Sequence, residues 1–448
     1  MKKTNGLFIV LLLISLIVLP SVTLAEDGFE QGNGWEYQNG SLRITENYGF
    51  TDFFSYDQSH NNKGNHPIGE DVTCLIIGKN VTVFNMFSFG APFFPTQTIV
   101  EDGNSYFTVV NGWLINTKTQ TLICAADLNN FQYIERVENI PSNVQYIGQY
   151  AFYPLNCIEY ILLPDSVIGI EDWAFSGCQA LERIDLSSNL RKVAAHAFDY
   201  CTSLQKLSAS NNLEKIGIGA FSSCYWLEKV QIENSYIETI EASTFQLCVE
   251  MRFIVLPEML EKVEREAFLH CTKLEAVIIK SSHVVIEDSA FAECENLQKI
   301  VFQQSPPQLL GSSLFGEDER TPDGKSFIMR RYDPNGKVIP YPTLYYTAAY
   351  AAEWAPNGET EWNGYPIQQI SQEELDAILA EARGEEAPAV SASPVPTETP
   401  QIETPVPEVS ISKPASDMGI GTILLVTVGL MAIVVVVIAI LRSRKEKK

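Results

Sequence analysis

The chain has 448 residues, of which 46% are hydrophobic, and its 55 acidic residues against 31 basic ones give a formal net charge of −24 at pH 7. This length and apolar content suffice for a large core and for more than one region. The acidic balance argues against a nucleic-acid binder, which needs a basic face to replace phosphate counterions. Nine cysteines are too dilute for a small disulfide scaffold, and 27 glycines with 23 prolines exclude a collagen-like or wholly disordered chain.

Residues 1–25 have the features of a secretory signal peptide. Lys2 and Lys3 provide a positive start, an almost unbroken apolar stretch runs to Leu19, and Thr23 and Ala25 are small residues at a cleavage site. The alternative is a transmembrane anchor, but the apolar stretch is short for a span and ends at Pro20. We therefore expect residues 1–25 to be removed on export.

Residues 418–441 contain no charged residue and are long enough to cross a hydrocarbon core of about 30 Å as a helix. The tail of residues 442–448 carries five basic residues, so by the positive-inside rule it stays cytoplasmic and the preceding chain lies outside. Wall-sorted surface proteins end similarly, but they carry a Leu-Pro-x-Thr-Gly motif, which residues 411–418 do not match. We expect a retained single-pass membrane anchor.

The middle of the chain is a repeat array. An Ala-Phe pair or a degenerate copy of it recurs every 23 or 24 residues, ending at Leu314-Phe315. The repeated phenylalanines before that copy, which we expect in the core, are Phe152, Phe175, Phe198, Phe221, Phe245, Phe268 and Phe291. Apolar residues at nine and eleven positions after each phenylalanine have strand spacing, with both side chains on one face. A unit of 23 residues cannot bury such a set alone, so the pattern predicts a solenoid whose stacked units share a core. Each unit should contain a strand, a second short extended piece and a tight helical turn at Ala-Phe-x-x-Cys.

The pattern of Ile, Ala-Phe-x-x-Cys, Leu, Ile and Leu-Pro, clearest from Ile170 to Pro257, resembles the BspA-like class of leucine-rich repeat. The stretch from Trp35 to Ile44 resembles a first hairpin of that family, and residues 104–122 resemble its hairpin insertion. The resemblance covers roughly residues 30 to 370. It implies a β-rich leucine-rich repeat solenoid in a cell-surface protein that binds other proteins or host matrix, without a catalytic activity.

These patterns divide the chain into eight segments. We expect a signal peptide at 1–25, a β-rich N-terminal flank with degenerate repeats at 26–130, the leucine-rich repeat array at 131–315, a C-terminal cap at 316–370, a short helix at 371–384, a Pro/Thr/Glu-rich stalk at 385–417, the transmembrane helix at 418–441 and the cytoplasmic tail at 442–448. The short helix is predicted by a capping box at Ser371 to Glu374, followed by apolar residues at helical spacing.

Six cysteines stand three residues after a repeated phenylalanine: Cys178, Cys201, Cys224, Cys248, Cys271 and Cys294. Metal ligation is disfavoured because no close Cys pair is present. Disulfides are disfavoured because stacked copies of one position point the same way instead of facing each other. We expect a ladder of buried free thiols. Cys74, Cys124 and Cys157 lie outside this ladder, and a disulfide among them stays open.

No sequence motif indicates catalysis, a metal or a cofactor. The five histidines form no metal-binding pair, and no glycine loop suited to phosphate is present. Two functions stay in view. The first is a membrane-anchored surface protein that binds an extracellular protein or matrix partner. The second is a carbohydrate-binding or polysaccharide-acting protein, with its site in the aromatic N-terminal flank or the C-terminal cap.

The solvent-facing strand positions of the last three repeats form an apolar patch. Its residues are Phe253, Val255, Ala276, Ile278 and Val301, with Lys280 and Lys299 at the rim. Soluble domains rarely leave such a patch open without a use, so it is the candidate partner-binding surface, with Phe253 as anchor. The alternative is that the C-terminal cap folds back over it.

Overall fold

A computed structural model describes much of residues 30–385. The described residues are 30–47, 49, 72–84, 95–131, 133–153, 155–307, 309–310, 314–315, 318–320, 327–329, 331–332 and 337–385. The predicted signal peptide, transmembrane segment and cytoplasmic tail lie outside these residues, as does the predicted stalk beyond Glu385. None of the helices in the described ranges has the length and apolarity that a bilayer crossing requires.

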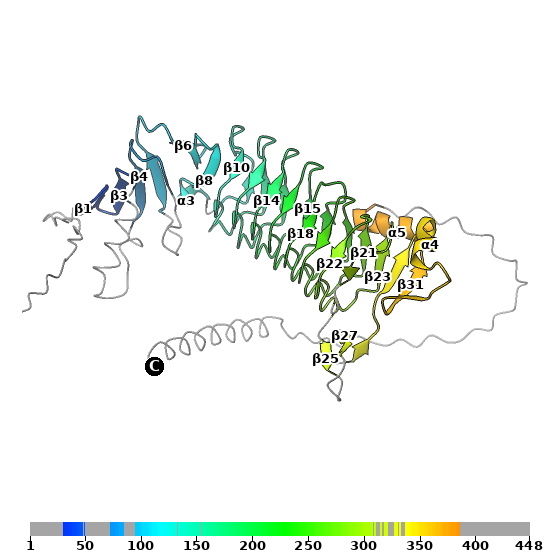
Figure 1. The fold of residues 1–448 in the computed structure, drawn as a ribbon. Helices are drawn as coiled ribbons and strands as arrows, with labels where there is room; N and C mark the ends of the chain where they lie inside the picture. The colour runs from blue at the N-terminus through cyan, green and yellow to red at the C-terminus, as the bar shows by residue number, and fades with distance from the viewer. Residues whose placement is uncertain are drawn as a thin grey trace, which may run out of the picture. The chain divides into compact units, whose positions relative to one another are not determined.

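Two long sheets of short strands form the solenoid (Figure 1). We call the first the front sheet, with the strand order β30-β31-β29-β23-β21-β19-β17-β15-β13-β11-β9. Its bounds are β9 (Arg136–Val137), β11 (Tyr160–Leu162), β13 (Arg183–Asp185), β15 (Lys206–Ser208), β17 (Lys229–Gln231), β19 (Phe253–Leu256), β21 (Ala276–Ile279), β23 (Lys299–Phe302), β29 (Thr343–Tyr346), β30 (Glu361–Trp362) and β31 (Tyr365–Gln369).

The second long sheet, which we call the back sheet, has the order β24-β22-β20-β18-β16-β14-β12-β10-β8-β7-β6. Its bounds are β6 (Phe107–Val110), β7 (Trp113–Asn116), β8 (Thr121–Ala125), β10 (Tyr146–Ile147), β12 (Gly169–Ile170), β14 (Lys192–Val193), β16 (Lys215–Ile216), β18 (Thr239–Ile240), β20 (Lys262–Val263), β22 (Val285–Ile286) and β24 (Leu309–Leu310). A back strand and the front strand that follows it form one rung.

The rungs pair in parallel with the period seen in the sequence. In the front sheet Tyr160 pairs with Arg183 and Lys206 with Lys229, so each rung advances the register by one repeat. Because strand side chains alternate, the apolar columns of both sheets point inward and form one continuous core. The structure is therefore the solenoid of stacked units that the period predicted.

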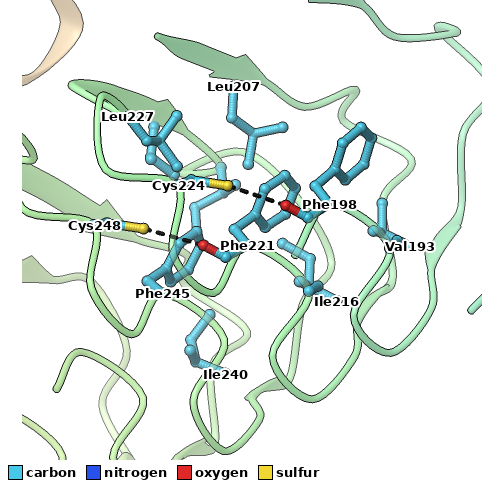
Figure 2. Close-up of a cluster of buried hydrophobic side chains, with 14 of the residues drawn as sticks. Val193, Phe198, Leu207, Ile216, Phe221, Cys224, Leu227, Ile240, Phe245 and Cys248 are labelled. Atoms are coloured by element: carbon cyan, nitrogen blue, oxygen red, sulfur yellow. Dashed lines mark hydrogen bonds between the residues drawn. The ribbon is translucent and has the colours of Figure 1, made fainter. Parts of the chain in front are cut away.

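The phenylalanine column forms the centre of this core. All seven repeated phenylalanines are fully buried, and their rings stack face to face. The Phe221 ring lies between those of Phe198 and Phe245, with centroid distances of 5.1 and 5.7 Å. Figure 2 shows these three rings between the back-strand residues Val193, Ile216 and Ile240 and the leucines near the front sheet. The column is in the core, as the sequence predicted.

The turn after each back strand differs from the expected helical turn. In rungs 2 to 7, counting from Phe152, each turn has two residues with left-handed backbone; in the third rung these are His196 and Tyr200, with φ of 54° and 59°. The phenylalanine N–H points along the solenoid axis and bonds the next rung, as in Phe198 N–H to the Ala220 carbonyl at 2.8 Å. The turn thus alternates bonds to the next rung with bonds between residues three apart, such as Cys201 N–H to the Phe198 carbonyl at 3.1 Å.

None of the nine cysteines forms a disulfide. The six ladder cysteines and Cys124 are buried, and Cys74 and Cys157 are half-buried. Each ladder thiol contacts the carbonyl of the phenylalanine in the preceding rung, as Cys201 does with Phe175 at 3.1 Å and Cys224 with Phe198 at 3.2 Å (Figure 2 shows the latter). Burial raises the pKa of the Cys178 thiol to about 12 and that of Cys224 well above its ordinary value. A cysteine fits this position because it is small, apolar and still a weak donor.

The N-terminal flank is a separate five-stranded sheet with its own core around Trp35, Leu42 and Leu75. Its strands are β1 (Glu30–Gly32), β2 (Trp35–Gln38), β3 (Ser41–Ile44), β4 (Cys74–Ile77) and β5 (Gln97–Val100). The hairpins expected at Asn39-Gly40 and Asn111-Gly112 are present, with positive φ at all four residues. A short helix, α3 (Leu128–Phe131), leads into the array.

Beyond Phe315 the described part of the chain adds strands to the front sheet and then forms a helix. Strand β29 pairs in parallel with β23, and the Trp354 ring packs on Phe302 at 5.1 Å. The helix α5 spans Gln372–Arg383, with the Ser371 hydroxyl accepting from the Glu374 N–H and Gly384 in left-handed conformation at its end. The other elements are β25 (Asp318–Arg320), β26 (Phe327–Met329), β27 (Arg331–Tyr332), β28 (Val338–Ile339), a 3-10 turn at Ala348–Tyr350 and α4 (Ala351–Trp354).

Truncating the central phenylalanine tests the role of the stack. We expect Phe221→Ala to lower the free energy of unfolding by about 3–5 kcal/mol, because the side chain is fully buried and contacts rings on both sides. Urea unfolding followed by circular dichroism measures this loss. A loss below about 1 kcal/mol would contradict a core position for Phe221.

The thiol ladder predicts a loss of stability in alkali. Cysteines in the unfolded chain ionise near pH 8.5, whereas burial keeps the ladder thiols protonated to higher pH in the folded chain. The folded state therefore binds more protons above that pH, and its stability falls as the pH rises. We expect Cys201→Ala to flatten this fall by up to about 1.4 kcal/mol per pH unit between pH 9 and 11. Equal slopes for both proteins would show that Cys201 is not a buried thiol.

Candidate functional site

The apolar patch predicted as a partner-binding surface is covered by the chain itself. Val255, Ala276, Ile278 and Val301 are at most 4% exposed, and they form a cluster with Leu375, Ile378 and Ala382 of α5. Phe253 packs against this cluster and is half-buried. The expectation of an open surface here is therefore wrong. The cover is mainly the short helix, with Ile370 and Tyr345 of the cap packed against the same cluster, so the alternative in which a C-terminal segment folds back is right.

Ion pairs surround the covered patch. Arg383 of α5 binds Glu233 with Nε and Nη2 at 2.8 and 3.1 Å, and Arg252 lies 3.0 Å from Glu381. The predicted rim residues also pair within the chain, Lys299 with Glu374 and Lys280 with Glu233. Lys299 thus pairs directly with α5, whereas Lys280 lies near the same Glu233 carboxylate that Arg383 of α5 binds.

The helix stops where the apolar surface stops. Its residues Leu375, Ile378, Leu379 and Ala382 recur at helical spacing and so face the sheet together. Gly384 ends it beside Lys229, where a Cβ atom would meet the lysine Nζ at 3.2 Å. Helix α5 reaches β17, where the Gln231 side chain donates to the Arg383 carbonyl at 3.1 Å. The front sheet from β9 to β15 lies beyond this point and is free of α5 in the part of the chain that the structure describes.

This uncovered face, which we call the open face, is formed by the outward residues of β9, β11, β13 and β15. Tyr160 on β11 lies between the Arg136 and Arg183 guanidinium groups, which are 4.1 and 5.5 Å from its ring centroid. The Tyr160 hydroxyl donates to Asp185 at 2.7 Å, and Arg183 donates two bonds to the same carboxylate at 2.9 Å. The four side chains form one network across three strands.

Partial burial acts to raise the pKa of Asp185, but the hydrogen bonds from Tyr160 and Arg183 outweigh it and leave that pKa below its ordinary value. The carboxylate is thus ionised at neutral pH and holds both donors in fixed positions. Leu162 beside the network is 41% exposed. The open face therefore combines fixed aromatic and cationic groups with an exposed aliphatic side chain.

Two hollows lie along this side of the front sheet, and the first of them borders the network. An open groove of about 480 Å³ lies between β13 and β15, where Arg183, Asp185, Lys206 and Ser208 contribute to its lining. A second hollow of about 410 Å³ lies where α5 ends, between Gln231, Glu233 and Arg383. The described residues contain no group of three or more His, Cys, Asp or Glu side chains placed to hold a metal ion.

Sequence reasoning identified the outward positions of the open face but ranked the apolar rungs above them. The signal was present, because Tyr160, Arg183 and Lys206 occupy one outward strand position in successive repeats. The sequence does not reveal that α5 covers the apolar patch of the last three repeats.

Undocking α5 should expose the apolar patch and leave the array folded. The α5 cluster is separate from the main core, so we expect Ile378→Asp to increase binding of a hydrophobic dye while shifting the main melting transition little. Asp376→Asn, at an exposed position of the same helix, is the matched control and should not bind dye. A loss of stability as large as that of Phe221→Ala would show that the patch belongs to the main core.

Comparisons with known proteins agree with this architecture. Residues 128–248 and 227–319 match the BspA type leucine rich repeat region, in six copies. No curated protein matches the chain.

Among solved structures, a leucine-rich repeat protein from Bacteroides ovatus is 23% identical with a TM-score of 0.36, and the match covers 59% of this chain and 67% of that one. One from Eubacterium ventriosum is 19% identical with a TM-score of 0.39, covering 59% and 63%. The pneumococcal vaccine antigen PcpA is 18% identical with a TM-score of 0.38, covering 56% and 58%. The chain thus spans less than two thirds of the latter two. Residues 128–319 of the chain are thus an array of BspA-type leucine-rich repeats.

Proposed function

We propose that this protein is a membrane-anchored, surface-displayed recognition protein that binds an extracellular protein or matrix partner through its open face. The observation that carries the proposal is the Tyr160 network, presented on a sheet that α5 leaves uncovered. The proposal includes no catalytic step and no cofactor.

The chemistry of the open face suits a protein partner. Tyrosine and arginine are the side chains that most often dominate binding energy at protein interfaces. Here Asp185 already accepts hydrogen bonds from Tyr160 and Arg183, and the Arg136 guanidinium packs on the Tyr160 ring. Little side-chain freedom is therefore lost when a partner docks, which leaves more of the contact energy as affinity.

The location at the cell surface rests on the sequence. The signal peptide at residues 1–25 would export the chain, the segment 418–441 would hold it in the membrane, and the stalk at 385–417 would separate the array from the bilayer. The array would then face outward with its open face accessible.

The described aromatic residues of the cap give little support to a carbohydrate site there. Trp354, Tyr365 and Tyr346 are at most 9% exposed and pack on the end of the array. Their number reflects the need to cover the last rungs.

Binding assays with two matched double variants test the proposal. The full-length chain and its variant Tyr160→Ala with Arg183→Ala are compared, by surface plasmon resonance, for binding to individually purified plasma and matrix proteins. We expect the variant to bind the captured protein at least about tenfold more weakly, because each truncated anchor costs 1 kcal/mol or more. The control is Lys192→Ala with Lys215→Ala, two partly exposed residues on the back sheet.

The control should bind like the wild type, and both variants should keep the wild-type melting temperature within a few degrees. A partner whose affinity is insensitive to the open-face variant but falls in the back-sheet variant would overturn the proposed site.

A further inference from the structure

Helix α5 lies between the array and the segment that the sequence predicts to reach the membrane. It follows β31, a strand of the front sheet, after only Ile370 and Ser371. It ends at Arg383, and the predicted stalk begins at residue 385. A force between a partner held on the open face and the membrane anchor therefore passes through α5, because this helix is the covalent link between the front sheet and the stalk.

The helix runs back along the front sheet, from the C-terminal rungs toward the open face. Glu374 in its first turn pairs with Lys299 on β23, whereas Arg383 in its last turn pairs with Glu233, which follows β17. The N-terminus of α5 is thus attached to β31, and the end that continues into the stalk lies on the rungs farther from β31. A pull on the stalk away from the sheet consequently enters α5 at Arg383 and loads its contacts from that end.

Ion pairs and hydrogen bonds hold the end of α5 that receives this load. Arg383 donates two bonds to Glu233 at 2.8 and 3.1 Å, and its carbonyl accepts from the Gln231 side chain at 3.1 Å. One turn back, Glu381 lies 3.0 Å from Arg252. The Glu233 side chain is only 14% exposed, so its bonds with Arg383 count for more than those of a fully solvated pair.

The apolar contact of α5 is separate from the core of the array. It involves four apolar residues of the helix and the outward residues of β19, β21 and β23, and this cluster shares no residue with the main core. A helix of 12 residues is marginal in water without such packing. Strand β31 pairs with β29, and β29 with β23, through bonds that do not involve α5. The helix can therefore leave the sheet without breaking a strand pair of the array.

We propose that α5 is a latch that releases under tension between a bound partner and the membrane anchor, before the rungs of the array open. The inference rests on the proposed function, because a partner on the array and an anchor in the membrane together supply the tension. Release of residues 371–384 replaces a helix of about 18 Å by a tether of up to about 50 Å, so the link lengthens by about 30 Å. The array stays folded, and the apolar patch around Ile278 becomes exposed.

The rungs of the array resist the same load in a different way. An interior front strand pairs with two neighbours, and the phenylalanine ring of its rung stacks between two others, as Phe221 does. Opening a rung of 23 residues breaks both strand pairings and lengthens the chain by about 75 Å. The size of a step therefore separates release of the latch from unfolding of the array.

Magnetic tweezers test the latch on the detergent-solubilised full-length chain, with one handle at each end of the chain. We expect the wild type to show a reversible step of about 30 Å at a lower force than any step of rung size. Ile378→Asp should abolish this step, because it places a charge in the apolar contact. Steps of rung size in every variant verify that the array is folded.

The ion pair at the loaded end gives a second, graded readout. Arg383→Ala should shorten the lifetime of the closed latch at constant force at least about tenfold, because it removes two bonds to a shielded carboxylate. The matched control is Arg191→Ala, which removes an exposed pair with Glu214 beside the back sheet and should behave like the wild type.

The latch is overturned if the first step of the wild type is of rung size, or if a step of about 30 Å persists in Ile378→Asp. A control that shortens the lifetime as much as Arg383→Ala overturns it as well. No partner takes part in this measurement, so the latch can fail while the open face still binds, and a failure of the binding assay leaves the step unchanged.

Discussion

Each side chain in the core of this solenoid has as its main neighbour the same side chain of the next rung. The stacked rings of Phe198, Phe221 and Phe245 are the clearest case, with successive planes within 10° of parallel and successive centroids 5.1 and 5.7 Å apart. A single rung has nothing to cover the two faces of its ring, so no rung is stable alone and the array exists only as a stack. The spacing between strands and the stacking distance of aromatic rings are nearly equal, which lets one residue type serve every position of the column.

The same constraint explains the cysteines and the turns. In each rung the phenylalanine carbonyl accepts the backbone N–H of the cysteine three residues later, as in Cys201 N–H to the Phe198 carbonyl at 3.1 Å. The same carbonyl also contacts the cysteine thiol of the following rung, so the thiol is a second donor to a buried acceptor. A more polar side chain would be costly to bury at this position. The ladder of free thiols is therefore part of the turn geometry rather than a redox or metal site.

What the stacking leaves unconstrained is the outside. Outward positions on the front sheet, the back sheet and the turns are not enclosed by the core, so each surface can differ from rung to rung. The front sheet uses this freedom twice, with apolar residues under α5 and the Tyr160 network on the open face. Recognition and coverage are thus properties of the outer positions, while the inner ones maintain the scaffold.

The sequence by itself determined the inner half of this protein. The period of 23 to 24 residues, the buried phenylalanines and the thiol ladder follow from local spacing, because stacking gives each repeat the same environment. The helix after Ser371 follows from its capping box and apolar spacing, and the two hairpins were implied by the family resemblance. Only the tertiary structure decided which outer surfaces stay free. The apolar stripe of α5 and the apolar patch around Ile278 were both visible in the sequence, but their pairing joins residues about a hundred positions apart outside the repeat period. No local pattern encodes such a contact, so the identity of the open surface became clear only once the helix was placed.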